Sequence, residues 1–308
     1  MTTGAQIAAT QYNSIRNQII DVLGSGSGNR GYGQTIQSAA VFSGNIITKA
    51  QWEALRYDLF NIKVHQDGVA PNLAEVAPAP AAIRYGAGEP NFNFEFVATN
   101  ATANRFNIGN GQSILSTKAT RTFGTSWSVS ATTELTVSFA TADDARYFFN
   151  SGGKITFTST RTGGSATSQN NAWTNTLSQA GTQSFGANTP LNINFYTLTN
   201  AYAGGEFYQL NNSTPYSANY YQIAAKCDVP NNSVGGATVL TFRITWKDDY
   251  VDPDVISGFP AGTNPASGVV DGTLSLIVEE LKASGSLQPT GSFTISSPVY
   301  SLAVISAT

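Results

Sequence analysis

The residues most capable of chemistry lie in one acidic run and one tyrosine-rich run. Calcium takes six to eight hard oxygen ligands, which carboxylates and backbone carbonyls can supply. The acidic run KDDYVDPD lacks the turn glycine and the terminal glutamate of the common calcium loop. We therefore expect a solvated acidic turn at a strand end. Its weak candidate metal ligands are Asp248, Asp249, Asp252 and Asp254.

The tyrosine-rich run, YQLNNSTPYSANYYQ at residues 208–222, mixes aromatic rings with amides and hydroxyls. Tyrosine rings stack on the apolar faces of sugars, and amides bind sugar hydroxyls. The run predicts either a glycan-binding face or, as the more common arrangement, strand residues that face a core or a subunit interface. The candidate glycan-face residues are Tyr208, Tyr216, Tyr220 and Tyr221.

No local spacing of residues predicts catalysis. His65 is the only histidine, and it follows a helical stripe beside a polar turn, so we expect an exposed or helix-capping side chain. Glu279 and Glu280 are adjacent and would point to opposite faces of a strand, whereas a glycosidase needs two facing carboxylates. Cys227 is the only cysteine, which argues against an internal disulfide and a cysteine zinc cluster. We predict a non-enzymatic protein without catalytic residues or a cofactor.

Composition narrows the classes of partner. The 308 residues carry a net charge of −3 and only 11% charged side chains, against roughly 25% in ordinary soluble domains. Without a basic run we expect no nucleic-acid partner. The first residues, MTTGAQIAAT, lack the charged and apolar regions of a signal peptide, and no later stretch reaches 18 apolar residues. We therefore expect neither secretion by that route nor insertion into a membrane.

The clearest internal repeat aligns residues 7–22 with residues 47–62 without a gap. Both copies place apolar residues at helical spacing, and Thr48 with Gln51 has the spacing of a capping box. Two such helices must bury their apolar stripes on each other, on the β-region or on a partner chain. We predict an assembly interface formed by Tyr12, Ile15, Ile19, Trp52, Leu55 and Leu59.

The connector between these helices contains GSGNRG at residues 26–31, which matches the dinucleotide-binding pattern G-x-G-x-x-G. That pattern binds a pyrophosphate only when a strand precedes it and a helix follows within a βαβ unit. Here a helix precedes it, so we expect a flexible loop.

A helix is also predicted inside the β-rich region, in TADDARYFFNSGGKITF at residues 141–157. Thr141 is a suitable N-cap, Asp143 and Asp144 fall in the first turn, and Gly152 can end the helix. First-turn charge is a commoner role for the two aspartates than acid catalysis or metal binding. A strand should precede this helix and another should follow it.

The rest of the chain indicates a mainly β protein with an N-terminal α-helical segment, an α+β fold whose body is an antiparallel β-sandwich. We predict a helical docking unit at 1–70, a Pro/Ala-rich linker at 71–90 and a β-rich body at 91–308. The body has two possible subdomains, about 91–180 and 181–308. Its short apolar runs, beginning with NFNFEF and including LNINFYTL and GSFTISS, are predicted strands. Beyond 141–151 we expect at most a turn near Gly181.

Several phrases of the chain resemble virion structural proteins of tailed phages, particularly those that infect cyanobacteria. These phrases are MTTGAQIAATQYNSIRNQI, GYGQT, DDARYFFNSGGKITF and VDGTLSLIVEELKASGSLQPTGSFTISSP, of which ARYFFNSGG is the most specific. The resemblance implies a component of the tail, baseplate, fibre or neck that works by assembly with copies of itself and with other virion proteins. It would be made and assembled in the host cytoplasm and located in the virion tail.

Two other functions compete with this interpretation. A receptor- or carbohydrate-binding module of a tail fibre would use the 208–222 tyrosines to bind a host surface glycan. A polysaccharide depolymerase would need convergent carboxylates, which no part of the sequence places together.

Overall fold

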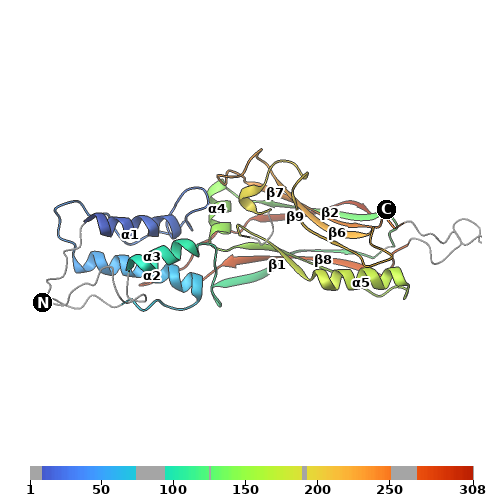
Figure 1. Cartoon of the computed structure of the whole chain (residues 1–308), viewed down its shortest axis with the longest axis horizontal. Helices are drawn as coiled ribbons and strands as arrows, with labels where there is room; N and C mark the ends of the chain where they lie inside the picture. The colour runs from blue at the N-terminus through green and yellow to red at the C-terminus, as the bar shows by residue number, and fades with distance from the viewer. Residues whose placement is uncertain (1–8, 74–93, 125, 189–192, 251–268, 308) are drawn as a thin grey trace, which may run out of the picture. The chain divides into compact units, whose positions relative to one another are not determined.

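The structure, a computed structural model, describes residues 9–73, 94–124, 126–188, 193–250 and 269–307 (Figure 1). The chain divides into two compact units, each built from segments that are distant in sequence. Unit 1 comprises Met1–Leu115, Thr141–Lys154 and Leu281–Ser297, and unit 2 comprises Ser116–Ala140, Ile155–Glu280 and Pro298–Thr308. The predicted division at residues 70 and 90 is therefore wrong, and most of the predicted linker lies outside the described residues.

Unit 1 is helical and confirms the repeated pair. Its helices are α1 (Ala9–Val22), α2 (Lys49–Asp67), α3 (Phe94–Ala103) and α4 (Ala142–Asn150). Helix α2 begins with the predicted capping box at Thr48 and ends at Gly68, whose φ of 75° is left-handed. Helix α4 begins at the predicted N-cap Thr141, whose side chain accepts a hydrogen bond from the Asp144 backbone N–H at 3.0 Å.

The apolar stripes of α1 and α2 are buried inside unit 1. The Tyr12 ring contacts the Trp52 ring edge-on at 5.6 Å, and Trp52 contacts Phe94 of α3 at 5.1 Å. All six predicted interface side chains are at most 1% exposed; these are Tyr12, Ile15, Ile19, Trp52, Leu55 and Leu59. The assembly interface assigned to them is therefore wrong, because helix α3 and the facing helix of the pair bury these stripes within the chain itself.

Helix α3 lies where the sequence predicted a strand. The alternation of Phe92, Phe94 and Phe96 suggested a half-buried strand, but residues from Phe94 onward are helical and bury Phe94, Val97 and Ala101. Those three positions follow the 3-4 spacing of one helix face, which packs against α1 and α2. The two-residue period was too short a signal to decide between the two structures.

The GSGNRG loop is held in place by side chains of α4. Arg146 donates from Nε to the Gly28 carbonyl at 3.0 Å, and from Nη2 to the carbonyls of Ser25 and Arg30 at 3.2 Å each. Asn150 Nδ2 donates to the Gly31 carbonyl at 3.1 Å. Gly31 has a φ of 86°, and a Cβ there would lie 2.4 Å from the Ser25 carbonyl oxygen. The loop is therefore a fixed turn, not the flexible connector predicted.

Unit 2 is a sandwich of two antiparallel sheets, as predicted from the short apolar runs. The strands are β1 (Ser113–Phe123), β2 (Ser130–Ser138), β3 (Lys154–Thr162), β4 (Thr182–Phe185), β5 (Glu206–Asn211), β6 (Tyr220–Cys227), β7 (Val239–Lys247), β8 (Thr273–Ala283) and β9 (Val299–Ala307). The four-stranded sheet has the order β1-β8-β3-β4, and the five-stranded sheet has the order β5-β6-β7-β2-β9. Because β2 pairs with β7 and β9, the suggested subdomains at 91–180 and 181–308 are not separate.

Phenylalanine rings from both sheets fill the space between them. Phe157 of β3 contacts Phe242 of β7 at 5.1 Å, and Phe185 of β4 contacts Phe207 of β5 at 5.4 Å and Phe242 at 5.0 Å. All four side chains are at most 2% exposed. Side chains that alternate along each strand thus build the core of the sandwich.

Three further sequence predictions were wrong, two in unit 2 and one in unit 1. Helix α5 (Ser168–Ala180) was not predicted, because only Ala172, Trp173, Leu177 and Ala180 are apolar among its polar residues. The described part of LNINFYTL forms a short 3-10 helix, Phe195–Thr197. GSFTISS, in unit 1, contributes only an isolated bridge between Ser286 and Ser292.

Candidate functional site

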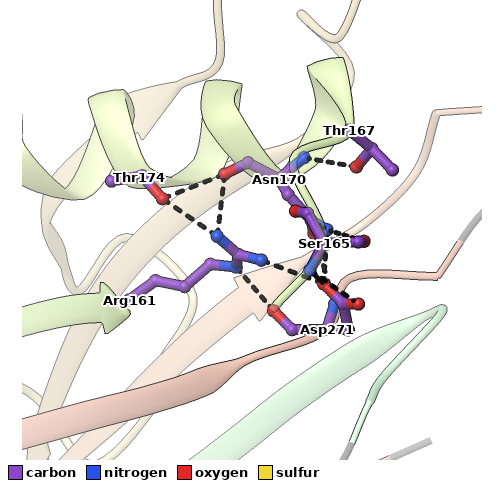
Figure 2. Close-up of polar contacts among 6 residues, drawn as sticks. All are labelled: Arg161, Ser165, Thr167, Asn170, Thr174 and Asp271. Carbon is purple, nitrogen blue, oxygen red and sulfur yellow. Dashed lines mark hydrogen bonds and ion pairs between the residues drawn. The ribbon is translucent and has the colours of Figure 1, made fainter. Parts of the chain in front are cut away.

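A dense polar cluster of the sandwich joins the start of helix α5 to the segment before β8. Figure 2 shows six side chains of this cluster, from β3, the loop after it, α5 and the β8 entry. They are Arg161, Ser165, Thr167, Asn170, Thr174 and Asp271, and we call them the Arg161 cluster. None of these six residues lies in a motif that the sequence predicts to be functional.

Arg161 and Asn170 connect the parts of this cluster. Arg161 Nε donates to the Asp271 carbonyl at 2.7 Å, and its Nη2 donates to Asp271 Oδ1 at 3.1 Å. Asn170 Nδ2 donates to the Ser165 carbonyl at 3.0 Å and also to Asp271 Oδ1. In return, the Asp271 backbone N–H donates to Asn170 Oδ1 at 3.2 Å.

The cluster is arranged to stabilise charge, not to react. Burial opposes ionisation of Asp271, but hydrogen bonds from Ser165 and Asn170 and the charge of Arg161 lower the pKa of its carboxyl group overall. Arg161 is 4% exposed at its side chain, and burial lowers the pKa of its guanidinium. The hydrogen bonds to Asp271 come from the loop after β3 and from helix α5, so the Arg161 cluster fixes the start of α5 in place.

A second polar group lies where three neighbouring strands of the five-stranded sheet end. Asn212 donates from its backbone N–H to the Asn219 carbonyl at 2.9 Å, and β6 pairs with β7 so that Asn219 lies opposite Asp248. The three side chains are 4%, 0% and 5% exposed. They share the inner face with the stacked rings of Tyr221 and Trp246. We call Asn212, Asn219 and Asp248 the Asp248 row.

The Asp248 row contains buried polar atoms without a partner in the described part of the chain. These atoms are Asn212 Oδ1 and Nδ2, Asn219 Nδ2 and Asp248 Oδ1. Gln169 of α5 donates to Asp248 Oδ2 at 2.6 Å, while burial raises the pKa of the Asp248 carboxyl group to about 6. Equal numbers of donors and acceptors suit a water molecule or a hydroxyl group better than a cation.

The described half of the acidic run does not form a metal site. Asp248 points inward, whereas Asp249 is exposed and pairs with Lys247 at 2.9 Å. Asp252 and Asp254 lie outside the described residues. Within the described ranges, no three or more His, Cys, Asp or Glu side chains gather in a way that could hold a metal ion.

The four tyrosines of the candidate glycan face do not share one face. Tyr221 is buried and accepts a hydrogen bond from Ser159 at 3.1 Å, and its ring contacts that of Tyr208 at 5.9 Å. Tyr216 instead contacts Tyr250 at 4.7 Å. The side chain of Tyr220 points to the opposite face from that of Tyr221, because adjacent strand residues alternate. The four-tyrosine face is therefore wrong, and Tyr220 alone remains on the outer face of the strand.

The side chain of Glu280 is buried between the two sheets, where it is held by other side chains. It is 1% exposed, accepts a hydrogen bond from the Tyr300 hydroxyl at 2.9 Å, and lies 3.3 Å from Lys118 Nζ. Burial and the neighbouring carboxylate raise the pKa of Tyr300. Glu279 is half-buried on the other face of β8, as the strand alternation predicted.

His65 is in the core of unit 1, so the predicted exposed or capping histidine is wrong. Its ring stacks on Phe293 at 4.4 Å and contacts Tyr32 at 5.0 Å. Nε2–H donates to the Ser151 carbonyl at 2.9 Å, which leaves the buried Nδ1 as an acceptor without a described partner. Burial lowers the pKa of His65 to about 4, so the ring is neutral at physiological pH.

Unit 1 also has a cleft of about 330 Å³ in which Arg16, Gln34, Thr35 and Tyr147 are the main side chains. Gln34 donates to the Thr294 carbonyl and accepts from the Thr294 N–H, both at 3.0 Å. Arg16 Nε donates to the Ser38 carbonyl at 2.9 Å. Gln34 and Arg16 therefore use these groups to hold the fold, and the cleft carries no acid–base pair.

Comparison of the chain with protein-family models, with curated proteins and with solved structures gives no match. Helices long and apolar enough to span a lipid bilayer are not found among the described residues.

We predict that Asn170→Ala destabilises the protein by about 2 kcal/mol, because Asp271 and the Ser165 carbonyl each lose the buried amide of Asn170 as a donor. The matched control is Asn171→Ala, one residue along the same helix and exposed. That variant should stay within about 0.5 kcal/mol of the wild type. Urea denaturation followed by tryptophan fluorescence measures both, and equal effects would contradict a clamping role for Asn170.

We predict that Asp248→Asn stabilises the protein by about 1–2 kcal/mol at pH 7.5, since it removes a buried charge with one orphan oxygen. The folded state holds its proton up to about pH 6 and the unfolded state only to about pH 4, so the wild-type penalty develops between these values and is complete above pH 6. Below about pH 4 both states are protonated, and the gain should vanish.

The control for this pH dependence is Asp249→Asn, which changes an exposed carboxylate. Thermal melts at pH 4 and pH 7.5 make the comparison. A gain for Asp248→Asn that is the same at both pH values would show that ionisation of Asp248 is not the cause.

Proposed function

We propose that this chain is a structural component of a bacteriophage tail apparatus, in the baseplate, fibre or neck. It acts by assembly with copies of itself and with other virion proteins. The sequence resemblance to virion proteins of tailed phages supplies the biological class. The observation that carries the proposal is an unprotected edge of the five-stranded sheet.

The exposed edge is strand β9, which is last in its sheet. It pairs with β2 alone among the described strands, so its other side offers backbone N–H and C=O groups. Val299 is 71% exposed and Ile305 is 50% exposed. Monomeric proteins usually protect such an edge, so this one suits a subunit that joins another chain.

The polar interior supports a scaffold rather than an enzyme. The charged side chains of the Arg161 cluster and of Glu280 form hydrogen bonds within the fold. With only 11% charged residues, most of the polar surface consists of hydroxyls and amides, which cost less to bury in a contact than charges do. The hydroxyls and amides of the surface therefore suit contacts with other subunits. Catalysis would instead require charged side chains that are not already bound within the fold, and the described sites do not provide them.

We expect the chain in purified tailed particles, at a constant ratio to other tail proteins. Quantitative mass spectrometry of particles from a lysed host culture measures the ratio, and immunogold electron microscopy places the chain on the particle. Free capsid heads separated from tails serve as the control. Recovery of the chain only from the particle-free lysate would contradict the proposal.

A carbohydrate-binding module is the second candidate, supported by the outer face beside Tyr220. Gln222 Nε2 donates to Gln209 Oε1 at 2.8 Å, and Gln209 Nε2 donates to Asn211 Oδ1 at 3.0 Å. Asn211 lies opposite Tyr220 in the β5-β6 pair, so an aromatic ring adjoins a ladder of amides. Such a combination suits a sugar ring and its hydroxyls.

For this candidate we expect binding on a glycan array that Tyr220→Ala reduces about tenfold, the value of one sugar–ring contact. Tyr216→Ala, whose ring contacts Tyr250, is the matched control and should bind normally. An array without any signal for the wild-type chain would argue against this function.

A further inference from the structure

We propose that β9 pairs antiparallel with β9 of a second copy of the chain, so that two five-stranded sheets join into one. This inference rests on the proposed function of self-assembly and names the surface and the partner. The two sheets would be related by a two-fold axis perpendicular to them, which makes the contact closed and self-complementary.

The main chain of β9 is regular where a second strand would bind. Val299–Val304 pairs in continuous register with Thr133–Ser138 of β2, and the register shifts only beyond Thr133. A regular edge of this length presents alternating donors and acceptors to a new strand. The irregularity near Ile305 marks the end of the segment available for pairing.

The sequence of β9, VYSLAVISA, contains none of the residues that usually protect an edge. It has no lysine or other charge, no proline and no glycine. On the side chains described, Val299, Val304 and Ile305 are 71%, 39% and 50% exposed. Pairing over Val299–Val304 would partly cover Val299 and Val304 as well as satisfy the backbone.

The edge is already ordered, which reduces the entropic cost of binding. Tyr300 anchors β9 to the opposite sheet through Glu280, at 2.9 Å. Lys118 adds an ion pair to Glu280, and Thr133 Oγ1 donates to the Ala303 carbonyl at 2.8 Å. Preorganised elements lose less freedom on association than mobile ones.

Charge selects a second β9 as the partner strand. Strand β1 carries Lys118 and Arg121, β5 carries Glu206, and β4 has only four residues. Two copies of β1 or of β5 would bring like charges together, whereas two copies of β9 bring none. Pairing of β9 with β5 of another copy is the alternative arrangement, and it would give an open filament instead of a closed dimer.

The test compares Val299→Lys with Val234→Lys in the full chain. Val234 is 69% exposed in unit 2 but lies in the loop between β6 and β7, so both variants make the same chemical change at similar exposure. Analytical ultracentrifugation over a range of concentrations measures self-association. We expect a wild-type dimer, an increase of at least about tenfold in the dissociation constant for Val299→Lys, and no change for Val234→Lys.

Hydrogen exchange measured at low and high protein concentration locates the contact independently of any variant. We expect concentration-dependent protection in β9 and none in β5. Filaments, protection in β5, or a dimer that Val299→Lys leaves intact would each overturn the inference, as would a wild-type chain that stays monomeric at all concentrations.

The two proposals can fail separately. A β9 dimer from a chain that is missing from tailed particles would overturn the phage-tail function and leave the pairing standing. If the chain is found in tailed particles but Val299→Lys does not change its self-association, the β9 pairing is overturned and the phage-tail function stands.

Discussion

The sandwich depends on filling the space between its two sheets, and the rest of unit 2 is arranged around that requirement. The rings of Phe157, Phe185, Phe207 and Phe242 meet from four different strands and exclude water from the middle. Polar side chains that lie on the inner faces must therefore find partners there. Glu280 does so with Tyr300 and Lys118, whereas several atoms of the Asp248 row have no partner among the residues that the structure describes.

The same requirement explains how a chain with few charges still adopts one defined fold. Each of its buried charged groups is tied to segments far away in sequence, as Arg161 is to Asp271. Amides perform much of the remaining work, for example Asn170 at the start of α5 and Asn219, whose Oδ1 accepts the backbone N–H groups of Asp249 and Tyr250. As a result, the loss of one such amide would leave several polar groups without a hydrogen-bond partner.

Sequence patterns predicted elements well where local chemistry defines both ends. The capping box at Thr48 and the cap at Thr141 located two helices, and the strand expected before the second of them is β2. Patterns failed where few residues carried the signal: α3 was hidden by three alternating phenylalanines, α5 by its polar composition, and β1 by exposure on both faces.

The site residues show a different limit, which concerns long-range contacts. An apolar stripe at Tyr12 or Trp52 shows that a helix face is covered, but not that α3 covers it. The burial of His65 depends on Phe293, more than 200 positions away, and no local pattern contains that information. Strand alternation predicts that Tyr220 and Tyr221 point to opposite faces, but only once β6 is known to be a strand.

The turn at GSGNRG has a consequence for how glycine patterns are interpreted. In nucleotide-binding proteins such a turn aims N–H groups outward and creates a positive cradle for phosphate. Here the spacing is the same, but carbonyl oxygens converge on the Arg146 guanidinium, so the local polarity is reversed. The carbonyl oxygens of the turn therefore bind a cationic side chain from the chain's own helix α4, which is the reverse of a phosphate site.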